Sequence, residues 1–114
     1  MMGQSGMAAE IKPSTVSSVF LKACDEKGDA PSMHVMRDGK HLTWSWTQFK
    51  KEAYAFSKSL THLAVDERSV INIMGFNSPE WAISYYGGIL HNNVVSGVYT
   101  TNGAEACKYQ AHHS

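Results

Sequence analysis

The chain of 114 residues lacks the features that mark secreted, membrane-spanning and nucleic-acid-binding proteins. Residues 1–10 contain no apolar h-region, so we do not expect a signal peptide. No apolar run approaches the roughly 20 residues that a helix needs to span a bilayer. Ten basic side chains balance ten acidic ones, which gives no electrostatic argument for binding nucleic acid or an anionic membrane.

Cysteine is scarce, and its placement argues against a metal site. The two cysteines, Cys24 and Cys107, lie too far apart in the sequence to form a metal-binding pair. Without a secretory signal, we interpret them as reduced thiols of an intracellular, cytoplasmic protein. Cys107 with His112 and His113 is a poor ligand set, because it offers one cysteine at a chain end. We therefore predict no metal ligands.

Motifs that carry catalysis or hold phosphate are also absent. Gly75–Pro79 follows a predicted strand and opens a predicted helix, but it matches neither the Walker pattern nor G-x-G-x-x-G. No Ser/His/Asp arrangement and no spaced pair of carboxylates is present. The six histidines show no ligand spacing within a predicted helix. We therefore predict no catalytic and no cofactor-binding residue in this chain.

The sequence does contain clear helix and hairpin signals. Residues 1–12 have no periodicity and are predicted to be a disordered leader. The next apolar pattern predicts a helix from about Thr15 to Lys27, with Gly28 as its C′ residue. Ser32–Thr43 then reads as a β-hairpin, because its Asp38-Gly39 dipeptide suits a type I′ turn.

A longer helix is predicted over Ser45–Leu63. Ser45 and Gln48 fit a capping box. The apolar residues that follow repeat every three or four positions and form one stripe: Trp46, Phe49, Ala53, Phe56, Leu60 and Leu63. The run is short for a coiled coil, so we expect a packed surface helix. For Trp44 and Trp46, core packing is favoured over an aromatic ligand platform.

The centre of the sequence predicts a βαβ unit. Val70–Met74 resembles a strand buried on both faces, and Val94–Tyr99 a second strand. Between them, Ser78 caps a helix that runs from Pro79 to about His91. The strands should be parallel and the crossover right-handed. Gly87-Gly88 suggests a close approach of helix to sheet, with a plain kink as the alternative.

A further helical pattern starts at Ala104, so the fold class is α/β: a helix, a hairpin, a long helix, the βαβ unit and the beginning of another helix. A doubly wound sheet needs more than two parallel strands. We therefore expect residues 13–114 to be the incomplete front portion of a larger N-terminal domain. An unfinished sheet leaves an open edge and uncovered apolar surface, which predicts marginal stability.

One constellation has a physical argument for ligand binding. In open α/β sheets, ligands bind beyond the carboxyl ends of the parallel strands. Polar residues follow both predicted strands there, and helix N-termini at this edge favour anions. The candidate ligand edge consists of Asn77, Ser78, Thr100, Thr101 and Asn102. The alternative is that Ser78 and Asn102 are only helix caps and that the threonines end a strand.

Three segments carry a family resemblance: Gly75–Trp81, Gly97–Asn102 and Ala104–Tyr109. Together they resemble the long-chain fatty acyl-CoA synthetases of the bubblegum type, in the AMP-forming adenylate ligase superfamily. Leu42–Phe49 and Asp25–Pro31 resemble earlier segments of the same family. The matches occur in family order and span nearly the whole chain. The chain departs from the family at His91-Asn92-Asn93, at Gly103-Ala104 and after Tyr109.

The resemblance implies a fatty acid substrate that ATP and Mg²⁺ activate to an acyl-adenylate, followed by transfer to coenzyme A. The resemblance is also compatible with peripheral association with the endoplasmic reticulum. The family's phosphate-binding loop and catalytic lysine lie downstream and are absent here, so we expect this chain alone to be inactive. Two other hypotheses stay open: a stand-alone, non-catalytic α/β interaction module, and a small nucleotide-binding domain.

Overall fold

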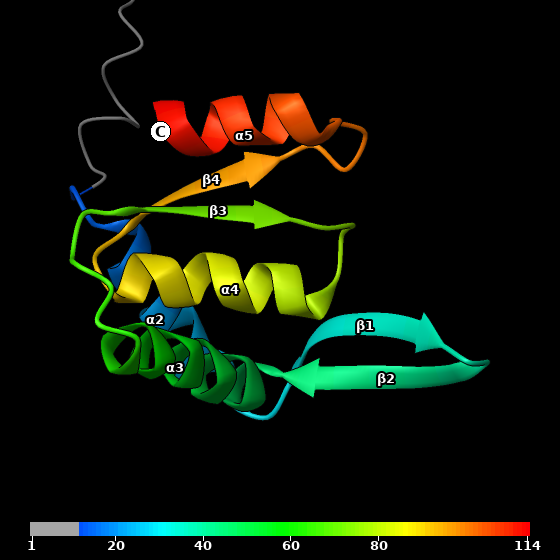
Figure 1. Cartoon of the computed structure of the whole chain (residues 1–114). Helices are drawn as coiled ribbons and strands as arrows, with labels where there is room; N and C mark the ends of the chain where they lie inside the picture. Colours follow the sequence, from blue (N-terminus) through cyan, green and yellow to red (C-terminus); the bar gives the residue numbers. More distant parts are fainter. Residues whose placement is uncertain (1–11) are drawn as a thin grey trace, which may run out of the picture.

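The structure is a computed structural model that describes residues 12–114, so the predicted leader lies almost wholly outside the described residues. The chain is a mixed α/β protein, as predicted (Figure 1). Its elements, in order, are α2 (Val16–Lys27), β1 (Pro31–Arg37), β2 (Lys40–Ser45), α3 (Trp46–His62), β3 (Val70–Met74), α4 (Pro79–Leu90), β4 (Val94–Val98) and α5 (Ala104–His113).

The ends of α2 and α3 are set by local hydrogen bonds that the sequence predicted in part. Thr15 caps α2 and forms a capping box with Ser18, and Gly28 ends the helix at φ +52°, which suits glycine. At the start of α3, the Ser45 Oγ accepts from the Gln48 N–H at 3.1 Å. The Gln48 Oε1 accepts from the Ser45 N–H at 2.9 Å. The predicted capping box is confirmed.

The hairpin forms around Asp38-Gly39, as predicted. Arg37 pairs with Lys40, and the antiparallel ladder continues toward Ser45. Asp38 and Gly39 have φ of +50° and +71°, the left-handed conformation that a type I′ turn requires at both positions. β1 and β2 form a sheet of their own, and Figure 1 shows it projecting away from β3 and β4.

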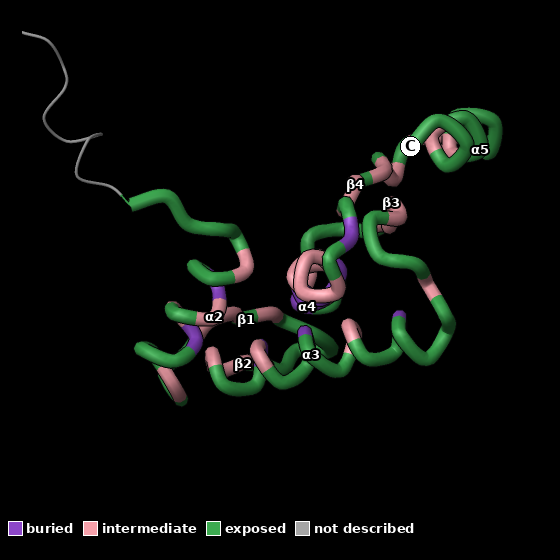
Figure 2. The backbone as a smooth tube through the Cα atoms, turned by 90° about the vertical axis from the view of Figure 1, so that its left-hand side faces the viewer, coloured by how far each residue is buried: buried purple, intermediate pink, exposed green. Residues whose placement is uncertain are grey.

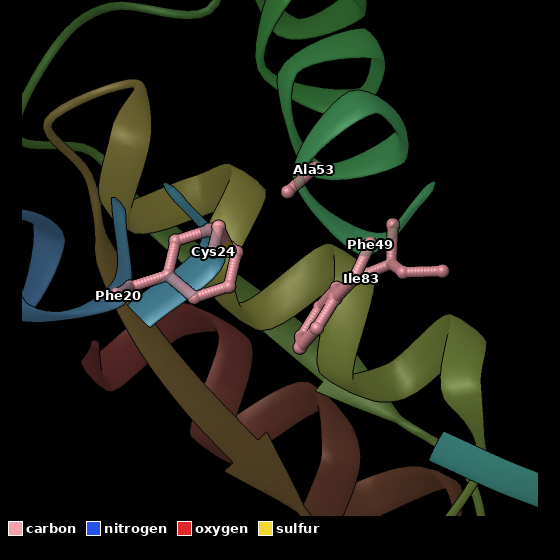
Figure 3. Packing of buried hydrophobic residues seen from close by; sticks show 5 residues of the cluster. All are labelled: Phe20, Cys24, Phe49, Ala53 and Ile83. Atoms are coloured by element: carbon pink, nitrogen blue, oxygen red, sulfur yellow. The ribbon is translucent and has the colours of Figure 1, made fainter. Parts of the chain in front are cut away.

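The core lies between α2, α3 and α4. Its buried side chains are Phe20, Cys24, Phe49, Ala53 and Ile83 (Figure 3). Trp44 and Trp46 pack against this cluster, so the core-packing interpretation is confirmed. Leu63, at the end of the predicted apolar stripe, is instead 70% exposed. Both cysteines are free, and burial raises the pKa of the Cys24 thiol.

β3 and β4 pair in parallel from Val70↔Val94 to Met74↔Val98, joined by α4, as predicted. Crossover handedness stays a prediction. Neither strand is buried on both faces, which corrects the expectation for Val70–Met74; Met74 is 51% exposed. The reason is that only one face of this sheet is firmly covered by a helix. α4 covers one face, whereas α5, which has no buried residue, contacts the other only loosely (Figures 1 and 2).

The two adjacent glycines of α4 allow two different close approaches. A Cβ added to Gly88 would lie 2.7 Å from Val95 Cγ2, so the predicted close approach of helix to sheet is confirmed there. A Cβ added to Gly87 would lie 2.7 Å from Phe56 Cδ1 and 2.8 Å from the Ala53 carbonyl oxygen. Gly87 therefore brings α4 against α3 rather than against the sheet.

Candidate functional site

The parallel strands bring the loops after β3 and β4 to the same edge of the sheet. Between these loops lies an open groove of about 430 Å³. It is lined by Gly75, Phe76, Asn77, Trp81, Gly97, Val98, Tyr99 and Thr100. The position agrees with the general rule that ligands of open α/β sheets bind beyond the carboxyl ends of the strands.

The structure divides the five predicted edge residues into two groups. Asn77 and Thr100 line the groove. Ser78 does not; its Oγ accepts from the Trp81 N–H at 3.2 Å and caps α4. Thr101 is exposed outside the groove, and Asn102 donates from Nδ2 to Gln110 Oε1 at 3.0 Å. The cap interpretation is therefore right for Ser78. It is wrong for Asn102, because Gly103 holds the N-cap position of α5.

Trp81 is one of six groove residues that the sequence reasoning left out of the site. Its ring lies over the strand ends: a Cβ added to Gly75 or Gly97 would be 3.7 or 3.6 Å from the indole. The Trp81 ring also stacks on the ring of Tyr85, one helical turn further along α4. The two ring centroids are 5.6 Å apart and the ring planes are nearly parallel. An aromatic pair at i and i+4 directly after a cap was a signal that could have identified it.

Two aromatic side chains of the groove are strongly exposed. Phe76 is 81% and Tyr99 is 77% exposed. Of the residues that the structure describes, those lining the groove include no charged side chain. The groove therefore offers flat apolar surface with the neutral polar groups of Asn77, Thr100 and Tyr99, and it suits an uncharged part of a ligand.

A pair of charged side chains lies beside the groove, in a depression that also contains Trp81. Arg37 Nη1 and Nη2 donate to Glu80 Oε1 and Oε2 at 2.7 and 2.5 Å. These bonds, helped by a backbone bond and by Ser78, lower the pKa of Glu80 to about 2. They also raise the pKa of Arg37. Both side chains line a neighbouring depression of about 310 Å³ that shares Trp81 with the groove.

The described residues do not make a site for nucleotide phosphates or a metal. The groove has no cation to neutralise a phosphate. Among residues 12–114, no three histidine, cysteine, aspartate or glutamate side chains gather closely enough to hold a metal ion. Within the same residues, no helix combines the length and apolar character needed to cross a bilayer.

Comparison with known proteins identifies the family. The model of the family described as AMP-binding enzyme matches residues 20–114. The chain belongs to the AMP-binding enzyme family. It is 34% identical over 110 residues to the long-chain-fatty-acid–CoA ligase ACSBG2 of Gallus gallus, covering 96% of this chain. It is 35% identical over 100 residues to ACSBG1 of Homo sapiens, covering 88% of this chain. The predicted resemblance to the bubblegum-type ligases is thereby confirmed.

The chain spans about 14% of the length of these curated relatives. Solved structures show the same arrangement of elements. The structure of CmiS6 superposes with a TM-score of 0.77 at 12% identity, over 90% of this chain and 28% of that one. The anthranilate CoA ligase AuaEII superposes with a TM-score of 0.74 at 15% identity, over 90% of this chain and 19% of that one. These likenesses establish the fold of part of an adenylate-forming ligase.

Proposed function

We propose that this chain works as the N-terminal part of an ATP-dependent long-chain fatty acid–CoA ligase. The observation that carries the proposal is the 34–35% identity to ACSBG ligases over 88–96% of the chain. Residues 13–114 would supply a partial domain: the first βαβ unit and the helices that pack on it. The relatives are far longer than this chain, so the remaining parts of the ligase come from elsewhere in such an enzyme.

In this proposal, ATP, Mg²⁺ and coenzyme A are bound by those remaining parts of the enzyme and not by this chain. The described residues lack a phosphate cradle and a metal-binding cluster, so they do not fit these groups. The chain alone should therefore neither adenylate a fatty acid nor transfer an acyl group. Its contribution would be structural support and one wall of a binding cleft.

The groove at the strand ends is the part of that wall that we assign to substrate. Asn77 and Thr100 would contact the ligand directly, with Trp81 as a flat apolar surface between them. Ser78 and Asn102 would act indirectly, by hydrogen bonds that fix the first turn of α4 and hold the loop before α5 to that helix. Thr101 is exposed outside the groove and is not assigned a contact with the ligand. Because the groove carries no charge, it would meet an uncharged part of the fatty acid or its activated form.

A segment exchange tests the proposed function. Residues 15–109 of this chain would replace the matching segment of human ACSBG1, and oleoyl-CoA formation would be measured with ATP and coenzyme A. We expect the chimera to retain at least about a tenth of the parent rate, since ordinary surface and core exchanges cost little activity. The control is ACSBG1 with the segment deleted. A soluble, folded chimera as inactive as that control would refute the proposal.

The interaction-module alternative has one observation in its favour, the open edges of the β3–β4 sheet. The tyrosine-rich face of α4 is not available to such a module. Tyr86 stacks on Phe20 with centroids 4.1 Å apart, and Tyr85 stacks on Trp81. The ligase proposal is therefore the stronger one.

For such a ligase we propose a cytoplasmic localisation, with peripheral association with the endoplasmic reticulum. Co-sedimentation of the purified chain with phosphatidylcholine vesicles, compared with the same chain without vesicles, would test that association.

A further inference from the structure

The Arg37–Glu80 pair joins two parts of the chain that are 43 positions apart. Arg37 ends β1, and Glu80 is in the first turn of α4. The two N–H···O contacts, at 2.7 and 2.5 Å, form a fork that fixes both the distance and the orientation of the partners. The position of Glu80 in the first turn also suits the positive end of the helix dipole.

The pair lies directly beside the groove wall. Glu80 precedes Trp81, and both line the depression that also contains Arg37. Gly75, Phe76 and Trp81 line this depression as well as the groove, so the ion pair and the candidate site share one wall. Any rotation of the first turn of α4 would move the indole relative to Gly75 and Gly97.

Stability alone does not account for this pair. Both side chains are substantially exposed, at 40% for Arg37 and 57% for Glu80, and exposed ion pairs contribute little to folding. A bidentate fork adds geometric specificity that a single charge contact lacks. Lys40, which lies opposite Arg37 in the hairpin, offers a matched cation at the same end of the sheet.

We propose that Arg37 is a positioning residue: through its fork to Glu80, the β1–β2 hairpin braces the first turn of α4 and holds Trp81 across the strand ends. The proposed effect of Arg37 on the position of Trp81 rests on the geometry alone. The effect on catalysis rests on the proposed ligase function. The hairpin is then a working part of the candidate site, although none of its residues lines the groove.

The first test reads the position of Trp81 in this chain by NMR. The nuclear Overhauser contacts from the indole to the α-protons of Gly75 and Gly97 would be measured in Arg37→Met, Glu80→Gln and Lys40→Met. We expect both contacts to weaken at least twofold in the first two variants and to stay unchanged in Lys40→Met. The charge-exchanged double variant, Arg37→Glu with Glu80→Arg, should restore both indole contacts. That result would show that the ion pair, and not either residue alone, positions Trp81.

The second test uses the same variants in the ACSBG1 chimera. Arg37→Met should raise KM for oleate about two- to fivefold, the effect expected of an exposed pair, and leave kcat within about twofold. The KM of Arg37→Lys should stay higher than the KM of the charge-exchanged double variant, because a lysine cannot form the fork. An inactive parent chimera would refute the ligase proposal and leave the NMR result standing. Unchanged indole contacts in Arg37→Met, or equal losses in Lys40→Met, would overturn the positioning role. An unchanged KM in an active chimera would overturn its effect on catalysis.

Discussion

At the scale of single residues, Gly87 and Gly88 show how much the missing side chain matters at a close approach. At either position, an added Cβ would lie 2.7 Å from an atom of another side chain, but the neighbouring atoms differ. Gly88 meets the Val95 methyl group, whereas Gly87 also meets the Ala53 carbonyl oxygen at 2.8 Å. Because a backbone atom of a packed helix cannot move aside cheaply, Gly87 is the less replaceable of the two.

We therefore predict that Gly87→Ala destabilises the chain by about 1–3 kcal/mol, the usual cost of overpacking. The loss should appear although alanine favours helices by about 1 kcal/mol over glycine. Urea unfolding followed by circular dichroism measures it. Gly103→Ala is the control, since nothing lies within 4 Å of its added Cβ, and its urea midpoint should stay near that of the parent. A Gly87→Ala variant as stable as the control would contradict the close α3–α4 contact.

Glu80 gives a prediction about acid. Its pKa falls from 4.5 to about 2 because Arg37 donates two hydrogen bonds to its ionised form. A lowered folded pKa means that the pair's stabilisation is fully present above pH 4.5 and is lost as the pH falls toward 2. The exposure of both side chains limits this loss to less than about 1 kcal/mol.

The Glu80 prediction is checked by comparing the parent with Glu80→Gln between pH 6 and pH 2. The parent should lose slightly more stability over this range than the variant does, as read from urea midpoints. In parallel, the carboxyl carbon of Glu80 should titrate near pH 2 in the parent and near its ordinary value in Arg37→Met. A parent Glu80 that titrates near 4.5 would show that the fork does not form in solution.

At the scale of elements, one buried amide fixes how β3 and β4 begin. Asn93 is 8% exposed, and its Nδ2 donates to the carbonyl oxygens of Asp66 and Ser69 at 2.9 and 3.1 Å. Its Oδ1 lies 2.6 Å from His91 Nδ1. These bonds tie the loop before β3 to the loop before β4, so they set the register that brings the two strand ends level at the groove.

We predict that Asn93→Ala destabilises the chain by about 1–3 kcal/mol, because the Asp66 and Ser69 carbonyl oxygens each lose one of two N–H donors and His91 Nδ1 loses its partner. Amide hydrogen exchange should also accelerate along Val70–Met74, since the strand loses its register contact. Asn72→Ala is the matched control: Asn72 is exposed, and its change should stay within about 0.5 kcal/mol. Unchanged exchange in Asn93→Ala would show that the register is set elsewhere.

The capped ends of the elements were the easiest part to predict. Ser45 with Gln48, Ser78 before Pro79, and the Asp38-Gly39 turn are short-range signals, and each formed as expected. The start of α5 was harder. A cap there requires a side chain at the N-cap position, and this position holds Gly103, whose helix has no side-chain cap bond. Asn102, one residue earlier, is left free to reach Gln110.

At the scale of the whole molecule, the β3–β4 sheet is the weakly covered part. Within residues 12–114 no further strand pairs with its two outer edges. The C-terminal segment touches its second face through exposed contacts, such as Asn72 Nδ2 to the Oγ of Ser114, directly after α5. The helical core between α2, α3 and α4 is better packed. We expect the two regions to respond differently to denaturation, because stability follows local packing.

We predict marginal stability for the isolated chain, with a broad thermal transition in which the sheet loses protection before the helical core does. Calorimetry and hydrogen exchange would measure it. Purified chain should also show no pyrophosphate release with ATP, oleate and coenzyme A, since the described residues include no phosphate cradle. A sharp, cooperative transition of a monomer would contradict the first expectation, and steady turnover the second.

The sequence by itself determined the helices, the hairpin and the parallel βαβ unit, because caps, turn dipeptides and periodicity act over a few residues. The family was indicated separately, by the resemblance of short segments such as Gly75–Trp81. The tertiary structure alone decided three other matters: which polar residues of the strand ends face the groove, that Trp81 forms its wall, and that Arg37 reaches Glu80. Each depends on contacts between distant segments, and a pattern within one segment carries no information about what another segment brings to it. Asn77 and Ser78 are neighbours in sequence, yet only the fold separates a groove residue from a cap.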